Sequence, residues 1–109
     1  MNQGISDDVA LLLEHLAAQD CEKLKQQCGA DFDCSRFFDV IFSYPAKFIT
    51  PPKHHHSSFN CVEFLDKSGC DIRAPLYSLE EGVSDLVACI QCKYNYQDNA
   101  YKIYDLLVP

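Results

Sequence analysis

The chain has 109 residues and a formal net charge of −7 at pH 7, with 48% hydrophobic and 12% aromatic residues. These values are typical of one folded domain with a modest core, residues 1–109. Residues 1–43 hold eight acids against three bases, and such a negative surface disfavours nucleic acid and anionic membranes as partners. No apolar run approaches the roughly 20 residues that span a membrane. The charge suits an acidic soluble domain, or one with a basic protein partner.

The N-terminal stretch "MNQGISDDVALLL" has no basic segment followed by an apolar one, so it does not form a secretory signal. This favours the cytoplasm or the nucleus. If the chain is a mature fragment, an extracellular location is expected instead.

Helical periodicity is the clearest pattern in the first part of the chain. Apolar residues recur at three- and four-residue spacing up to Gly29, which predicts a helix over residues 7–28. A second apolar stripe predicts a helix over residues 31–43, and Pro45 ends it. With so short a connection, the two helices are expected to pack as a helical hairpin.

Residues 45–60 show no periodicity and are expected to form an irregular Pro/His/Ser loop. Pro51-Pro52 favours extended polyproline geometry, and three consecutive histidines follow. In an extended segment only His54 and His56 share a face. We therefore expect a solvated loop, with weak metal contact or a pH-sensitive surface as the alternatives for these histidines.

The second half of the chain is compatible with helix or strand. Residues 60–69 fit a short helix or one arm of a hairpin, and the tail 94–108 fits strand and helix about equally. Ser78 and Glu81 form a capping-box pattern, which predicts a helix near residues 79–92. The predicted fold class is mostly α, an N-terminal helical hairpin followed by a smaller helical or mixed α+β half. The alternative is an α+β fold with a C-terminal antiparallel hairpin.

Four of the seven cysteines match part of a zinc-site pattern. Cys89 and Cys92 have the two-residue spacing of many structural zinc sites. Cys61 and Cys70 could supply two more thiolates, although eight intervening residues are many for one ligand pair. A small zinc-binding domain is therefore the first alternative function, with zinc as the cofactor. The leading hypothesis, a protein-interaction module, needs no cofactor.

The other candidate chemistry for the cysteines is disulfide formation, with Cys21, Cys28 and Cys34 as the candidates. Cys21 and Cys28 lie two turns apart on the first predicted helix, about 10 Å along its axis, so they cannot bond to each other. Cys34 on the second helix is the geometrically suited partner of either one, and Cys61 could pair with Cys70. The second alternative function is a disulfide-stapled extracellular ligand-binding domain.

The run "CEKLKQQCGADFDC" over residues 21–34 resembles the opening of the cysteine-rich helical modules of GDNF-family receptor alpha chains. Phe42, Ser43 and Tyr44 stand where that family has its next cysteine, and the later spacing differs. The resemblance therefore carries no function over to this chain.

Catalysis is not predicted, because the chain has no glycine-framed nucleophile elbow and no glycine-rich phosphate loop. The tyrosines crowd the C-terminal part near acids, and rigid amphipathic rings are common at protein-binding surfaces. We therefore expect a non-catalytic protein-interaction module that binds a protein partner. Its candidate faces are the acidic N-terminal helix and the tyrosines Tyr94, Tyr96, Tyr101 and Tyr104.

Overall fold

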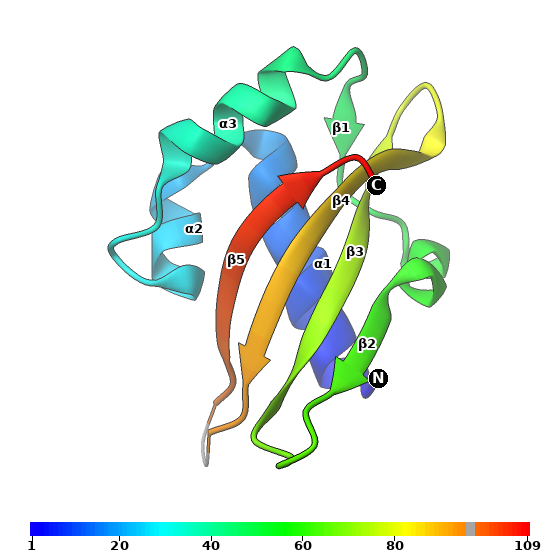
Figure 1. The fold of residues 1–109 in the computed structure, drawn as a ribbon. Helices are drawn as coiled ribbons and strands as arrows, with labels where there is room; N and C mark the ends of the chain where they lie inside the picture. Colours follow the sequence, from blue (N-terminus) through cyan, green and yellow to red (C-terminus); the bar gives the residue numbers. More distant parts are fainter. Residues whose placement is uncertain (96–97) are drawn as a thin grey trace.

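Three helices pack against a five-stranded antiparallel sheet in the computed structural model, which describes residues 1–95 and 98–109 (Figure 1). Helix accounts for 37% of the chain and strand for 34%. The predicted mostly α fold class is therefore wrong, and the alternative with one C-terminal hairpin also understates the sheet. In the described part of the chain, no helix has both the length and the apolar character needed to cross a bilayer.

The N-terminal part folds into three helices and not into two: α1 (Gln3–Ala18), α2 (Cys21–Cys28) and α3 (Cys34–Ser43). The helix predicted over residues 7–28 is interrupted at Gln19, whose φ of 53° is left-handed. Asp20 then caps α2 by accepting a hydrogen bond from a backbone N–H. The second predicted helix, 31–43, begins later than expected, because Asp33 is its N-cap.

The stretch expected as an irregular loop, residues 45–60, contains short regular elements: β1 (Phe48–Ile49), the 3-10 helix η1 (Lys53–Ser58) and the start of β2 (Asn60–Glu63). Strands β1 and β2 pair with different parts of the same side of β3, and η1 lies between them in the sequence. His55 of η1 is 1% exposed, and its Nε2 lies 2.7 Å from the carbonyl oxygen of Pro75 in β3. The imidazole therefore provides a partner for the Pro75 carbonyl, which lies between the parts of β3 that pair with β1 and with β2.

The second half of the chain is a β meander of three long strands: β3 (Gly69–Ser78), β4 (Gly82–Lys93) and β5 (Ala100–Leu107). The strand order is β1-β3-β4-β5, and β2 also pairs with β3. Residues 60–63 and 100–107 are thus strands, and the helix predicted near 79–92 is wrong.

The failed helix prediction rested on a real local interaction. The hydroxyl of Ser78 accepts a hydrogen bond of 2.9 Å from the backbone N–H of Glu81, as in a capping box. Here that bond closes a turn between two strands, because Gly82 has a φ of +73°. This left-handed conformation reverses the direction of the chain, whereas a helix would continue in the same direction. Beyond the turn, Leu86, Ala88, Ile90 and Cys92 alternate with the intervening side chains and form one buried row.

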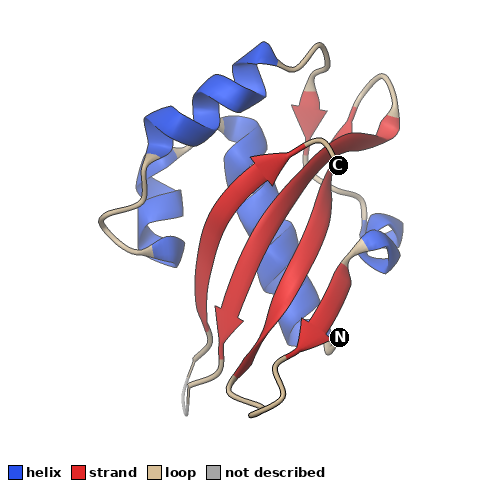
Figure 2. Ribbon diagram, in the orientation of Figure 1, coloured by secondary structure: helices blue, strands red, loops and turns tan. Residues whose placement is uncertain are grey.

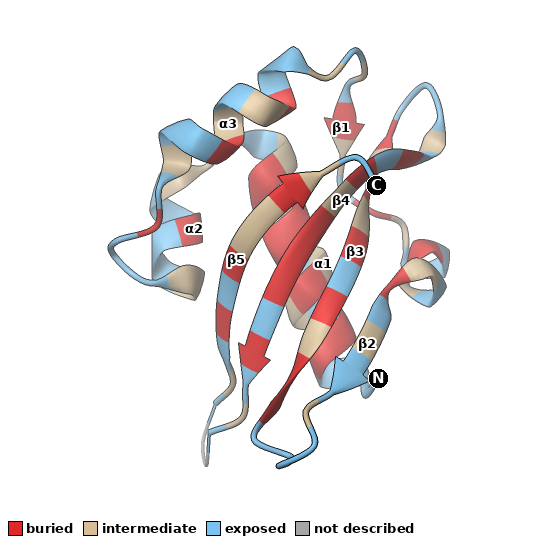
Figure 3. Cartoon of the chain, viewed as in Figure 1, coloured by how far each residue is buried: buried red, intermediate tan, exposed pale blue. Residues whose placement is uncertain are grey.

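The core lies between the helices and one face of the sheet, as the burial pattern shows (Figures 2 and 3). Helix α1 crosses behind the long strands and contributes the fully buried Val9, Leu12, Leu13 and Leu16. Full burial of each such side chain stabilises the fold by about 1.5–3 kcal/mol relative to exposure. The helices cover one face of β3, β4 and β5, and the opposite face remains open.

Candidate functional site

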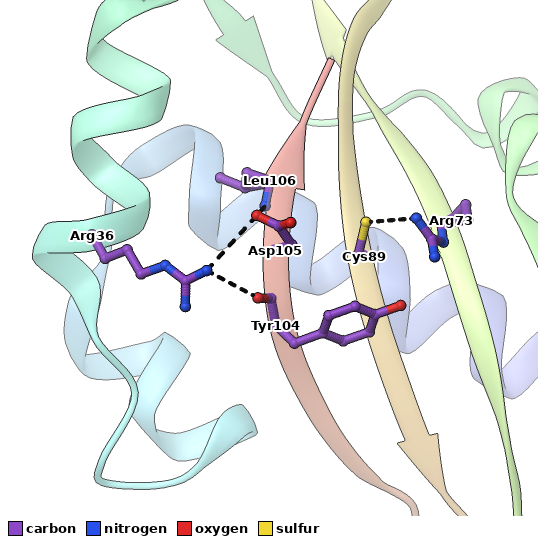
Figure 4. Close-up of polar contacts among 6 residues, drawn as sticks. All are labelled: Arg36, Arg73, Cys89, Tyr104, Asp105 and Leu106. Carbon is purple, nitrogen blue, oxygen red and sulfur yellow. Dashed lines mark hydrogen bonds and ion pairs between the residues drawn. The ribbon is translucent and has the colours of Figure 1, made fainter. Parts of the chain in front are cut away.

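The open face of the sheet carries a compact polar cluster around Arg73 of β3 (Figure 4). The Arg73 Nε lies 3.2 Å from the Asp71 carboxylate, and Arg73 Nη1 donates to the Cys89 sulfur at 3.1 Å. The guanidinium also lies 6.0 Å from the centroid of the Tyr104 ring. Three neighbouring strands, β3, β4 and β5, therefore supply this cluster, which we call the Arg73 cluster: Asp71, Arg73, Cys89 and Tyr104.

Tyr104 joins the cluster next to an irregularity in the pairing of β4 with β5. Cys89 is paired with Asp105 and the next residue of β4 with Ile103, so Tyr104 is an extra residue on β5. Tyr104 alternates with the buried Tyr101 and Ile103 and so lies on the open face, and the bulge shifts the alternation after it, so that Leu106 is buried. The Tyr104 hydroxyl donates a short hydrogen bond to the Asp71 carboxylate on β3. Its ring thus spans β4 beside Cys89 (Figure 4).

Helix α3 holds the outer edge of β5 next to the cluster. Arg36 Nη2 donates to the carbonyl oxygen of Tyr104 at 3.2 Å and lies 3.8 Å from the Asp105 carboxylate (Figure 4). The carbonyl is an edge-strand acceptor, so Arg36 supplies a donor that a further strand would otherwise supply. Both interactions are solvent-exposed and contribute to orientation more than to stability.

Burial raises the pKa of two members of the cluster, Cys89 and Tyr104, so both stay protonated at neutral pH. Burial raises the pKa of the Cys89 thiol against the opposing effect of Arg73, and the thiol is 0% exposed. Burial and then the hydrogen bond to Asp71 raise the pKa of Tyr104 to about 12. Arg73 and Tyr104 both donate to Asp71, which satisfies its charge. The cluster is therefore a rigid, preorganised polar surface with an enclosed, protonated thiol.

Arg73 also borders an apolar groove on the same face. The groove has a volume of about 250 Å³, and its lining comprises Ser58, Asn60, Arg73, Pro75, Val87, Leu107 and Pro109. Among the described residues of this lining, Arg73 has the only charged side chain, which is 47% exposed. An arginine has five N–H donors, and two are used within the described part of the chain, for Asp71 and Cys89. Three donors remain for a ligand.

A larger hollow of about 420 Å³ lies between α3 and the ends of β4 and β5. Val40, Tyr44, Leu106 and Val108 are among its lining residues, and Asp39 is the only charged one. Its described lining residues supply apolar surface but no positively charged side chain. The groove beside Arg73 is smaller, yet it combines apolar walls with a directed donor, as specific binding sites do.

The four tyrosines named as candidate partner-binding residues are not brought to one surface. Tyr101 lies on the helix-covered face, where it is 7% exposed and its hydroxyl donates to Asp8 of α1 at 2.6 Å. Tyr94 packs against the core, and its hydroxyl lies 3.4 Å from the Glu63 carboxylate. Tyr104 lies on the open face, and Tyr96 falls outside the described residues.

The four cysteines of the expected zinc site are divided between the two faces of the sheet. Cys70 and Cys92 belong to the core under the helices, with Cys61 packed against it, whereas Cys89 points to the open face beside Arg73. Among residues 1–95 and 98–109, no group of three or more His, Cys, Asp or Glu side chains could hold a metal. That finding includes the histidine run at 54–56.

Of the three disulfide candidates, Cys21 and Cys34 form a bridge and Cys28 is a free thiol. The bridge joins the first residues of α2 and α3. It leaves five free cysteines, Cys28, Cys61, Cys70, Cys89 and Cys92, among the seven in the chain.

Asp71 and Arg73, the centre of the site, were not singled out by sequence reasoning. The signal was present in "CDIRAPL", where Asp71 and Arg73 alternate with Ile72 and Ala74. Such alternation is typical of a half-buried strand with its polar residues on one face. Tyr104 alternates with Tyr101 and Ile103, but the residues of β3 and β4 that it meets depend on strand pairing, which has no signature in the local sequence.

Comparison with known proteins gives one match. A family model described as "Domain of unknown function (DUF7668)" matches residues 9–109. No curated protein and no solved structure matches the chain. The family match includes every strand of the sheet and all but the first turns of α1. The chain therefore belongs to the DUF7668 family.

Proposed function

We propose that this protein is a non-catalytic interaction module whose open sheet face binds an extended segment of a protein partner. The segment inserts an aliphatic side chain into the groove beside Val87 and Leu107 and places a carboxylate on Arg73. The observation that carries the proposal is that Arg73 is half exposed at the edge of an apolar groove, with three donors that no described residue uses. Arginine forms paired, directional hydrogen bonds with carboxylates.

The Arg73 cluster supports binding more than turnover. Its one potential nucleophile, Cys89, is fully buried with a raised pKa, and Asp71 is already occupied by two donors. A catalytic thiol needs exposure and a lowered pKa. Rigid side chains held in one geometry lose little conformational entropy on binding, which favours affinity.

The overall charge of −7 adds a long-range preference. An acidic surface steers basic proteins toward it and slows the approach of acidic ones. The partner is therefore a protein with net positive charge, and its contact segment presents one carboxylate. Arg73 would fix the register of that segment, and the groove would supply most of the apolar contact.

A minimal pair of ligands tests the proposal: N-acetyl-leucine, which has the aliphatic group and the carboxylate, and N-acetyl-leucinamide, which lacks the charge. In titrations at millimolar concentration followed by amide NMR shifts, we expect N-acetyl-leucine to shift Arg73, Val87 and Leu107 most. We expect the amide to bind at least several-fold more weakly, because a charged hydrogen bond contributes about 1.5–3 kcal/mol.

The substitution Arg73→Gln should remove the difference between the two ligands while the groove remains. The matched control is Arg36→Gln, which changes an exposed arginine that does not line the groove. Equal binding of the two ligands to the wild-type protein contradicts the proposal. So does a shift pattern centred on α3.

The Cys21–Cys34 bridge favours one second candidate, a disulfide-stapled extracellular ligand-binding domain. The two candidates differ in their number of free thiols. Titration of the unfolded, unreduced protein should give five thiols for the arrangement described here and one thiol for a fully stapled domain with three bridges.

A further inference from the structure

Three free cysteines gather on the helix-covered face of the sheet, away from the Arg73 cluster. In the pairing of β3 with β4, Cys70 lies directly opposite Cys92. In the pairing of β2 with β3, Cys61 lies opposite Ile72, whose side chain shares a face with that of Cys70. Cys61 is therefore diagonal to Cys70. The three thiols form a short row across β2, β3 and β4.

This arrangement suits disulfide exchange along the row. Directly opposite residues of antiparallel strands have Cα atoms about 4.5–5.5 Å apart, within the roughly 4.4–6.8 Å range of disulfides. Diagonal neighbours are about 7–8 Å apart. A shift of about 1 Å in β2, a four-residue strand, brings Cys61 within bonding range of Cys70.

The three thiols differ in access to solvent. Cys70 and Cys92 are both 0% exposed, so no dissolved oxidant reaches them directly. Cys61 is partly exposed on β2, which pairs on one side only within the described chain. The row thus has one entry point, and Cys70 is the middle member.

We propose that Cys61, Cys70 and Cys92 form a thiol–disulfide relay, which accepts oxidation from a small-molecule disulfide at Cys61 and stores it as a buried Cys70–Cys92 bridge. With oxidised glutathione, the Cys61 thiolate attacks one sulfur, forms a mixed disulfide and releases one glutathione. The Cys70 sulfur then attacks Cys61, forms a Cys61–Cys70 bridge and releases the second glutathione. Finally Cys92 attacks Cys70, and Cys61 returns to a thiol.

The chemistry balances over these steps. Two protein thiols lose two electrons and two protons, one disulfide forms in the protein, and the oxidised glutathione becomes two thiols. The bridge joins β3 to β4 behind the site of entry. A reductant then regains access only through Cys61, by the same exchanges in reverse.

The surroundings make the relay slow at neutral pH. Burial, and then the neighbouring Cys70 thiol, raise the pKa of Cys61 to about 11. The same two causes raise the pKa of Cys92 to about 12. Since the thiolate is the attacking species, the rate rises about tenfold per pH unit below the pKa of Cys61.

The test uses the folded protein with its Cys21–Cys34 bridge intact, treated with excess oxidised glutathione and quenched by acid. Non-reducing peptide mapping should find a transient glutathione adduct on Cys61 and a Cys70–Cys92 bridge as the end product. The rate of adduct formation should increase about tenfold from pH 7 to pH 8. Cys92→Ser should stop at a Cys61–Cys70 bridge.

The entry step is tested by Cys61→Ser, which changes a partly exposed residue of an edge strand and should slow formation of the buried bridge at least tenfold. The control Cys28→Ser removes another partly buried free thiol, on α2, and should oxidise at the wild-type rate. Undiminished oxidation of the Cys61 variant overturns the relay. So does a wild-type end product other than the Cys70–Cys92 bridge, or no bridge at all.

Discussion

Replacing both cysteines of the Cys21–Cys34 bridge with serine should destabilise the protein by about 3 kcal/mol. The bridge joins residues 13 apart in the sequence, and closure of a loop of about 15 residues in the unfolded chain corresponds to about 3 kcal/mol. The helices that it joins, α2 and α3, lie along the outer edge of β5 (Figure 1). For a chain of this size the midpoint of thermal unfolding should fall by about 15 °C.

Urea unfolding followed by circular dichroism gives the free energy of unfolding for the double variant and the wild type. Reductant should lower the stability of the wild type to that of the double variant and leave the variant unchanged, because the other five cysteines are already thiols. Cys28→Ser controls for loss of a thiol from α2 without loss of a bridge. If the double variant unfolds within 1 kcal/mol of the wild type, the argument from chain entropy is wrong.

Individual contacts of Leu12, Arg73 and His55 can be tested by single substitutions. Leu12→Ala should cost about 2–5 kcal/mol in urea unfolding, because Leu12 is 0% exposed between α1 and the sheet; a cost below 1 kcal/mol would contradict that packing. Arg73→Ala should speed the reaction of Cys89 with a thiol reagent, because the guanidinium covers the sulfur, and an unchanged rate would show that Arg73 is not its cover. Burial lowers the pKa of His55 below 6.5, so the unfolded chain takes up a proton first as pH falls. The free energy of unfolding should therefore decrease from pH 7 toward pH 5, and less so in His55→Gln; an equal decrease in that variant would contradict the assignment.

Sequence reasoning placed helix in the N-terminal part of the chain, with two helices where there are three, and missed most of the sheet. The periodic apolar residues of α1 and α3 have one interpretation, because a 3.6-residue repeat over several turns fits no strand. The segment 79–92 has two possible interpretations. Its apolar residues Val83, Leu86, Val87 and Ile90 match a helical stripe, whereas every second residue from Leu86 to Cys92 matches the buried face of a strand. The pairing of β4 with both β3 and β5 decides between them, and pairing is a tertiary property.

The position of the histidine run, residues 54–56, also depends on tertiary contacts that the local sequence does not specify. Pro51, Pro52 and the polar residues after them fit a solvated loop, yet His55 is buried against Phe59 and Tyr77. Its position follows from the gap between β1 and β2, where the Pro75 carbonyl needs a donor. A residue that completes a sheet edge is chosen by the geometry of that edge, which local sequence does not contain.

Cys89 and Cys92 are separated by two residues, and this spacing has different effects in a turn and in a strand. In a turn, two intervening residues bring a pair of thiols together around one metal ion. In a strand, residues three apart point to opposite faces, because side chains alternate with a period of two. Strand β4 therefore sends Cys89 to the Arg73 cluster and Cys92 to the thiol row under α1. The two cysteines serve separate sites, so Cys89→Ser should leave oxidation of the Cys70–Cys92 pair unchanged. A Cys89 that forms a disulfide with Cys92 in the folded protein would refute the strand assignment, and both proposals with it.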